Sequence, residues 1–317
     1  MNNNDTSNND MIARLYESLG ESHVMAPDVA HVEIHGNKVL GLHLVPGLDV
    51  QAEELEDGIR AEITVAENTT VEKPVRICFG MLPETGVQKI YMTTRLEDYS
   101  SISIVASCTF PNAVDVRHTM EAEIHIGKGA EYAYLERHVH GDAGGVAVIP
   151  RAAVYLDEGA RFRTDFELIQ GRVGHIDMEY EAFCGPRSIL EMSARINGTQ
   201  DDYIAINEKA HLQGEGAHGV LMTNIAVRDN ATAKIQNTMA ASAPEARGHV
   251  DCKEIVQGNA TASAIPVVEV KHSRAHVTHE ASVGSVDSKQ LETLMSRGLN
   301  ENEATDMIIQ GLLTPSY

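Results

Sequence analysis

The sequence has no tryptophan, and aromatic residues make up only 4% of its 317 residues. A core without large rings must be filled by valine, isoleucine, leucine, alanine and methionine in a chain that is 43% hydrophobic. Such side chains suit regularly stacked strands better than a deep, aromatic-lined ligand pocket. The composition therefore favours a β-rich protein, and the lack of tryptophan argues against an enzyme that acts on polysaccharide.

Long apolar runs and positive charge are also scarce. No apolar run approaches the roughly 20 residues that a membrane-spanning helix needs. The net charge of −21 argues against nucleic acid and anionic membrane surfaces as partners, because both would repel the chain. The Asn-rich segment 1–9 does not resemble a signal peptide, so we expect a cytoplasmic protein with a disordered segment there.

Only four cysteines are present, and they are widely spaced: Cys78, Cys108, Cys184 and Cys252. A zinc ribbon or a ferredoxin-type cluster loop needs clustered cysteines, so neither is expected. Without a secretion signal, these residues should be reduced thiols. The nucleophile elbow, the P-loop and the Rossmann glycine motif are missing too. Metal chemistry must therefore be assembled from distant residues or two chains, and any nucleotide site should come from a partner.

Regions 10–57 and 58–278 both contain strand-like patterns. A short helix is predicted over residues 10–22, and a hairpin over residues 33–50 with Gly36-Asn37 at its turn. From residue 58 onward, short alternating strands are joined by tight Gly/Asn-Ala corners, whose alanines are Ala130, Ala160, Ala231 and Ala260. Gly or Asn would supply the left-handed backbone, and Ala is small enough for a crowded corner. This repeat favours a stacked β-solenoid, with an ordinary β-sandwich as the alternative.

Region 279–317 differs, because it predicts two short helices. Asp287 or Ser288 can cap the first helix, and Asn300 with Glu303 forms a capping box at the start of the second. The apolar stripe of the second helix is expected to consist of Ala304, Met307, Ile308 and Leu312. Helices of about ten residues are unstable alone, so both must dock on something. They are either an end-cap of the solenoid or a docking surface for a partner.

Two groups of residues could carry chemistry. Cys252 precedes Lys253, which can favour a thiolate, although a lone cysteine is usually structural. Cys78 and Cys184 are expected to be structural, whereas the context of Cys108 is ambiguous, with a structural role favoured. His279-Glu280 offers iron one nitrogen and one oxygen ligand, or is a pair of polar residues at a turn. Adjacent strand residues point to opposite faces, so a symmetric dimer would be needed to bring both to one ion.

A further histidine pair, His138-Val139-His140, places two imidazoles on the same face of a strand. This spacing can bind a metal ion, but such pairs more often lie on a solvated face without a ligand role.

The segment 278–313 resembles the C-terminal signature of the SufB/SufD family of iron–sulfur cluster assembly scaffolds. The matching residues are His279-Glu280-Ala281-Ser282, Gly284, Asp287, Gln290-Leu291, Ser296-Arg297-Gly298-Leu299, Glu303-Ala304 and Ile308-Ile309-Gln310-Gly311. The upstream run 266–270 is also similar. The resemblance implies a right-handed parallel β-helix, which agrees with the solenoid interpretation. Together with the predicted helices, the expected fold is a mainly β solenoid with a short N-terminal helix and a C-terminal helix pair.

The resemblance also implies partners and site residues. A SufC-like ABC-type ATPase would bind the C-terminal helices through Leu291, Leu294, Arg297, Met307 and Ile308. Cys252, Glu280 and His279 match the positions that hold a transient iron–sulfur cluster between paired scaffolds, before it passes to client apoproteins. The chain is shorter than a typical SufB, and because it carries Cys252, His279 and Glu280 together it could pair with itself as a homodimer; a paralogous chain is the alternative partner. The alternative is an accessory subunit that regulates the ATPase and holds no cluster.

Overall fold

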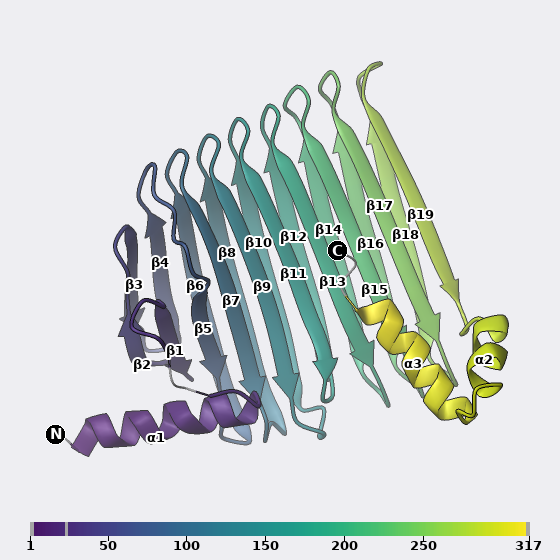
Figure 1. Ribbon diagram of the computed structural model, residues 1–317, viewed down its shortest axis with the longest axis horizontal. Helices are drawn as coiled ribbons and strands as arrows, with labels where there is room; N and C mark the ends of the chain where they lie inside the picture. The colour runs from purple at the N-terminus through teal and green to yellow at the C-terminus, as the bar shows by residue number, and fades with distance from the viewer. Residues whose placement is uncertain (1–2, 23–24, 315–317) are drawn as a thin grey trace.

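Two long sheets form the body of the protein, and the chain alternates between them (Figure 1). The computed structural model describes residues 3–22 and 25–314. Sheet A contains β1 (His31–His35), β2 (Lys38–His43), β5 (Val75–Gly80), β7 (Ser101–Phe110), β9 (Glu131–His140), β11 (Arg161–Gln170), β13 (Ile189–Gly198), β15 (His218–Val227), β17 (Arg247–Val256) and β19 (His276–Gly284). Sheet B contains β3 (Leu48–Glu54), β4 (Ile59–Val65), β6 (Thr85–Leu96), β8 (Asp115–Ile126), β10 (Val146–Leu156), β12 (His175–Cys184), β14 (Tyr203–Leu212), β16 (Thr232–Ala241) and β18 (Thr261–Val270). The predicted mainly β solenoid is confirmed, with about eight turns.

Neighbouring strands along the solenoid are parallel, whereas β1–β2 and β3–β4 are antiparallel pairs near its N-terminal end. The pairing register is kept from coil to coil over most of the solenoid, with one shift between β9 and β11 after Glu167, so equivalent side chains stack along it. Alternate residues face the interior between the sheets, which is filled by one large apolar cluster. The predicted hairpin turn at Gly36-Asn37 is confirmed, and Gly36 has a positive φ of 57°.

The corner alanines are buried, as small residues at a crowded corner should be. Gly129 and Gly159 directly precede their alanines and adopt the left-handed conformation, with φ of 62° and 69°. In the two later corners the left-handed residues are Asp229 and Gly258. The expectation that asparagine takes this role before Ala231 was therefore wrong, because the left-handed position there lies one residue earlier in the corner.

Helix α1 (Asn3–Ser18) covers the outer face of sheet A near its N-terminal end (Figure 1). It begins before residue 10, so residues 3–9 are helical and not disordered; residues 1–2 lie outside the described part of the chain. A hydrogen bond to the sheet supports the longer helix, because the Asn8 side-chain amide donates to the Leu40 carbonyl of β2 at 3.4 Å. Leu15 packs in a cluster with Cys78, which gives that thiol a structural position.

The C-terminal helices α2 (Ser288–Met295) and α3 (Glu301–Leu313) begin at the predicted caps. The Asp287 carboxylate accepts from the Gln290 amide at 2.8 Å, and the predicted capping box at the start of α3 is complete. The sheets extend beyond the predicted 58–278 on both sides, because β1 joins sheet A and β19 continues to Gly284. Among the described residues, no helix is both long and apolar enough to cross a membrane.

Candidate functional site

Cys252 lies on the inner face of β17 and is completely buried. The sheet register places Thr223 of β15 beside it on one side and Ala281 of β19 on the other. Paired positions on parallel strands point the same way. The thiol therefore lies inside the solenoid, one strand from the end of sheet A.

Polar side chains surround this thiol in an otherwise apolar interior. The Asn237 amide from β16 lies 3.8 Å from the Cys252 sulfur, and Glu208 of β14 is the register neighbour of Asn237. Glu254 follows Cys252 on the same face of β17, and within the described chain neither of its carboxyl oxygens has a hydrogen-bond partner. We call Thr223, Glu208, Asn237, Cys252 and Glu254 the lumen site.

Burial favours the neutral forms of the ionisable groups in the lumen site. It raises the pKa of Glu208 to about 8 and that of Glu254 to about 7. It also raises the pKa of the Cys252 thiol to about 11, and the nearby Glu254 carboxyl adds to that rise. Lys253 does not favour the thiolate as expected, because it points outward and its ammonium pairs with Asp251 at 2.5 Å. Cys252 in this conformation is a protonated, shielded thiol.

His279 and Glu280 lie within strand β19 and not in a turn, which corrects the sequence prediction. His279 pairs with the inward Val250, whereas Glu280 pairs with the outward Asp251. Cys252 and His279 therefore share the inner face, and Glu280 lies on the opposite face. Both β19 residues are exposed, because β19 is the last strand of sheet A in the described chain.

Sequence reasoning missed the other members of the lumen site. A signal was present in the coil repeat, because Thr223 occupies the position of Cys252 one coil earlier. Glu254 could have been found from strand alternation, since it lies two residues after Cys252. Glu208 and Asn237 lie on the opposite sheet, and finding them requires knowing which face of each strand turns inward.

Helix α3 docks on the outer face of sheet A in its own chain. Ile309 and Leu313 pack in one cluster with Ala226 of β15, and the Arg195 guanidinium donates to the Leu313 carbonyl at 2.8 Å. The predicted apolar stripe of this helix is partly wrong, because α3 buries Ala304, Thr305, Ile309 and Leu313. The sheet beneath the helix, and not helical periodicity alone, selects the buried side.

The residues predicted to bind a partner stay accessible after this docking. Met307 is 49% exposed, Arg297 is exposed, and Ile308 is half-buried. Leu291 and Leu294 of α2 are also half-buried, and α2 has no fully buried residue. The helix pair thus rests on the side of the solenoid and leaves apolar side chains accessible.

Comparison with known proteins agrees with this architecture and this C-terminal segment. The family model of the SUF system FeS cluster assembly SufBD core domain matches residues 85–312, which is more than half of the chain. This match places the solenoid in the class of iron–sulfur cluster assembly proteins. The chain belongs to the SufB/SufD family.

Several named relatives support this membership. An iron–sulfur cluster assembly SufBD family protein of Methanocaldococcus jannaschii is 38% identical over 267 residues, which cover 84% of each chain. A SufBD family protein of Pyrococcus horikoshii is 33% identical over 95% of this chain and 92% of its own length. The iron–sulfur cluster assembly protein SufB of Bacillus subtilis is 26% identical over 80% of this chain but only 55% of its own length. A role in iron–sulfur cluster assembly follows from this membership.

Proposed function

We propose that this chain is a scaffold subunit on which an iron–sulfur cluster is assembled and from which it passes to client apoproteins. The observation that carries the proposal is the position of Cys252, which lies under the terminal coil on the same inner face as His279. Cysteine thiolates are the usual ligands of iron–sulfur clusters, and imidazole also binds iron. The chain itself would act as a scaffold and not as an enzyme, in the cytoplasm.

Cluster assembly at Cys252 requires the terminal coil to move. The thiol is completely buried, and burial holds its pKa near 11, so it neither meets iron nor ionises in the closed conformation. Displacing β18 and β19 would admit solvent, lower the thiol pKa and uncover the inner face that Cys252 shares with His279. The cluster would be assembled in this open conformation and would leave it for a client apoprotein.

A second copy of the chain would complete the site. Strands β18 and β19 end the two sheets of the described chain and carry unpaired backbone edges, with Ile265, Val270 and Val283 about half exposed. Pairing of two such ends in a homodimer would bring two copies of Cys252 and His279 toward one axis. Glu280 lies on the other face of β19, so we assign it as a ligand that reaches this site from the second copy.

The force for opening would come from a SufC-like ABC-type ATPase on the C-terminal helices. Leu291, Leu294 and Ile308 are half-buried and Met307 is exposed, so they offer an apolar surface on the two helices that follow the terminal strand β19 in the chain. Helix α2 directly follows β19 in the chain, so movement of the helix pair would pull on the terminal strand. ATP-driven dimerisation of the ATPase would then shift the scaffold between closed and open states.

Anaerobic reconstitution tests the cluster assignment. The complex with its ATPase is incubated with ferrous iron and sulfide, and visible absorbance and iron content are compared between the wild type, Cys252→Ala and Cys184→Ala. Cys184 is a similarly buried inward cysteine on β12, so it is the matched control. We expect cluster absorbance to fall at least tenfold in Cys252→Ala only, and undiminished absorbance in that variant would reject the assignment.

The accessible apolar surface of α2 and α3 also fits an accessory subunit that regulates the ATPase without holding a cluster. In that case Cys252→Ala would be silent in every assay. Reversing the charge of Arg297, or removing α3, would abolish ATPase binding, as it also would for a scaffold. The cysteine variant therefore separates the two functions.

A further inference from the structure

A second polar cluster lies inside the solenoid, on strands distant from Cys252. Cys108 of β7 and Glu136 and His138 of β9 each place one possible ligand atom within 4.8 Å of the other two, and all three are buried. Cys108 and His138 are register neighbours, and strand alternation puts Glu136 on the face of His138. The histidine pair of the sequence therefore lies in the interior and not on a solvated face.

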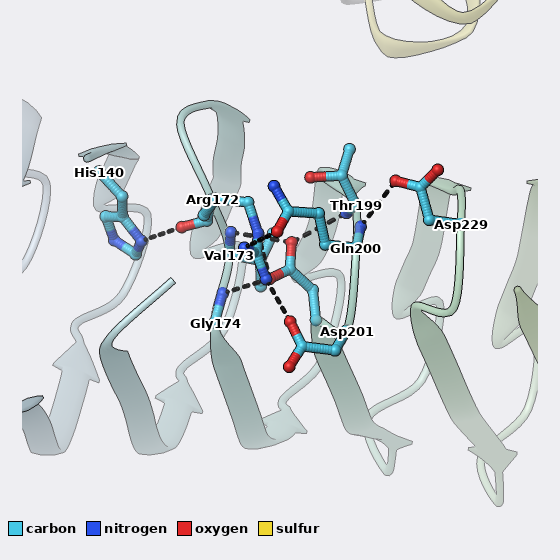
Figure 2. A network of polar contacts seen from close by, with 9 residues as sticks. His140, Arg172, Val173, Gly174, Thr199, Gln200, Asp201 and Asp229 are labelled. Carbon is cyan, nitrogen blue, oxygen red and sulfur yellow. Dashed lines mark hydrogen bonds and ion pairs between the residues drawn. The ribbon is translucent and has the colours of Figure 1, made fainter. Parts of the chain in front are cut away.

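Hydrogen bonds fix the tautomer of His140, which lies next to this cluster. Its Nδ1 is 2.9 Å from the Arg172 carbonyl oxygen, which can only accept, so Nδ1 carries the proton (Figure 2). A neutral His140 then has a lone pair on Nε2.

The same chain of hydrogen bonds fixes the tautomer of His138. Its Nδ1 lies 3.2 Å from the Nε2 of His140 and must donate to that lone pair. The remaining nitrogen, Nε2, is therefore unprotonated, and it faces the Glu136 carboxyl oxygen at 2.8 Å. Two lone pairs at this distance repel each other unless a cation or a proton lies between them.

A metal ion satisfies this arrangement. Two ligand atoms that each lie about 2.0–2.1 Å from a tetrahedral zinc ion are separated by roughly 3.3 Å. The nitrogen and oxygen here are 2.8 Å apart, so a small side-chain rotation that separates them by roughly 0.5 Å would admit the ion. The third donor is the Cys108 sulfur, and mixed sulfur, nitrogen and oxygen donors suit zinc or ferrous iron better than magnesium or calcium. We propose that Cys108, Glu136 and His138 bind one divalent transition-metal ion.

His118 of β8 is a candidate for a fourth ligand. Its ring centroid lies 6.0 Å from that of His138, and it is buried. Its Nδ1 has no hydrogen-bond partner in the described part of the chain. A buried nitrogen without a partner is costly, and a metal bond would remove that cost.

The surroundings support the ligands in the way that metal sites require. Ligating histidines commonly donate their other nitrogen to a second group, which fixes the ring and raises its basicity. Here that role falls to His140, whose own acceptor is held in place by the network shown in Figure 2. The Asp202 carboxylate accepts from the Arg172 guanidinium at 2.9 Å and from the backbone amide of Gly174 at 2.9 Å. These two hydrogen bonds hold the turn that carries the Arg172 carbonyl in one conformation.

The metal site is independent of the proposed cluster site. It joins β7 to β9, whereas Cys252 lies on β17 near the other end of sheet A. An ion held by two neighbouring coils would link them and stabilise the N-terminal half of the solenoid.

Cobalt substitution tests the proposal, because a thiolate bound to Co²⁺ gives a charge-transfer band in the near ultraviolet. Tag-free, full-length protein carrying Cys252→Ala is unfolded with a chelator, refolded with Zn²⁺ or Co²⁺, and analysed for metal content and absorbance. We expect one equivalent of metal with the band, loss of the band in Cys108→Ser, and at least a tenfold loss of affinity in His138→Gln. The controls Cys184→Ser and His211→Gln should retain the ion; His211 belongs to a partly exposed pair with Glu181 at 2.8 Å.

Two results would overturn the proposal. Folded protein without bound metal would show that a proton on Glu136 relieves the contact, and an intact cobalt–thiolate band in Cys108→Ser would place the ion elsewhere. Circular dichroism checks folding, and Glu136→Gln, which is nearly isosteric, replaces any variant that fails to fold. The metal content of the refolded Cys252→Ala protein decides the question even without the variants at Cys108, Glu136 and His138.

Discussion

Replacing Glu208 with glutamine should stabilise the protein, and only at neutral and alkaline pH. Glu208 is 1% exposed on the inner face of β14, and burial raises its pKa to about 8 from an ordinary value of 4.5. Below about pH 4.5 the carboxyl is protonated in both the folded and the unfolded state, so folding carries no ionisation penalty. As the pH rises to 8, the unfolded state ionises while the folded state stays protonated, and stability is lost.

The size of this loss follows from the two pKa values. Each unit of pKa difference corresponds to about 1.4 kcal/mol, so a difference of about 3.5 gives a limit of about 5 kcal/mol above pH 8. Glutamine keeps the shape and stays neutral, which removes the penalty. The difference in unfolding free energy between Glu208→Gln and the wild type should therefore grow by about 3–5 kcal/mol between pH 5 and pH 8.

Urea denaturation at pH 5, 6.5 and 8, followed by circular dichroism, measures this difference. Glu191→Gln is the control, because Glu191 is exposed on the outer face of β13 and its substitution should have little pH-dependent effect. A difference between Glu208→Gln and the wild type that does not change with pH would refute the reasoning. It would mean that the folded carboxyl ionises as readily as the unfolded one.

Two further predictions concern α3 and the buried thiols. Ile309→Ala removes a side chain that is 2% exposed, which should weaken the docking of α3 on the sheet by about 2–4 kcal/mol. Amide hydrogen exchange should then rise in α3 but not in β9 or β11, and unchanged exchange in α3 would contradict this prediction. The isolated native chain should react slowly with a thiol reagent at about pH 7.5, because all four cysteines are buried, and mass spectrometry should find the thiols labelled only after unfolding. Rapid labelling of Cys252 in the absence of the ATPase would show that the terminal coil opens unaided.

The fold could be predicted because its signals are local and repeated. Buried alanines at tight corners and short alternating strands are enough to indicate stacked coils, and side-chain caps such as Asp287 mark helix starts directly. The buried side of α3 was harder, since Ile309 and Ile308 are equally apolar and only the sheet beneath the helix distinguishes them. The start of α1 was missed for a related reason, because the Asn8 contact with β2 cannot be seen in local propensity.

The candidate site was predicted less completely than the fold. Cys252 and His279 were expected together, and the register does place them on one face. The sequence could not show that Cys252 is sealed from solvent, or that Lys253 turns away from it, because both depend on which side of β17 faces inward. The protonation state of Glu254 follows from the same missing fact, and that of Glu208 depends on which side of β14 faces inward.

The regular register of the stacked strands also limits how the length of this chain can change. Inserting a single residue inside a strand would exchange the inward and outward side chains of everything that follows in that strand, so the core positions would become polar. Extra residues are best accommodated in the corners or at strand ends, as near the end of β11, where the register with β9 shifts after Glu167. The interior itself lengthens by whole coils that bring their own inward set. We therefore expect natural length differences within the solenoid to occur as complete coils or as corner loops, so that the spacing between Cys252 and the terminal strand stays unchanged.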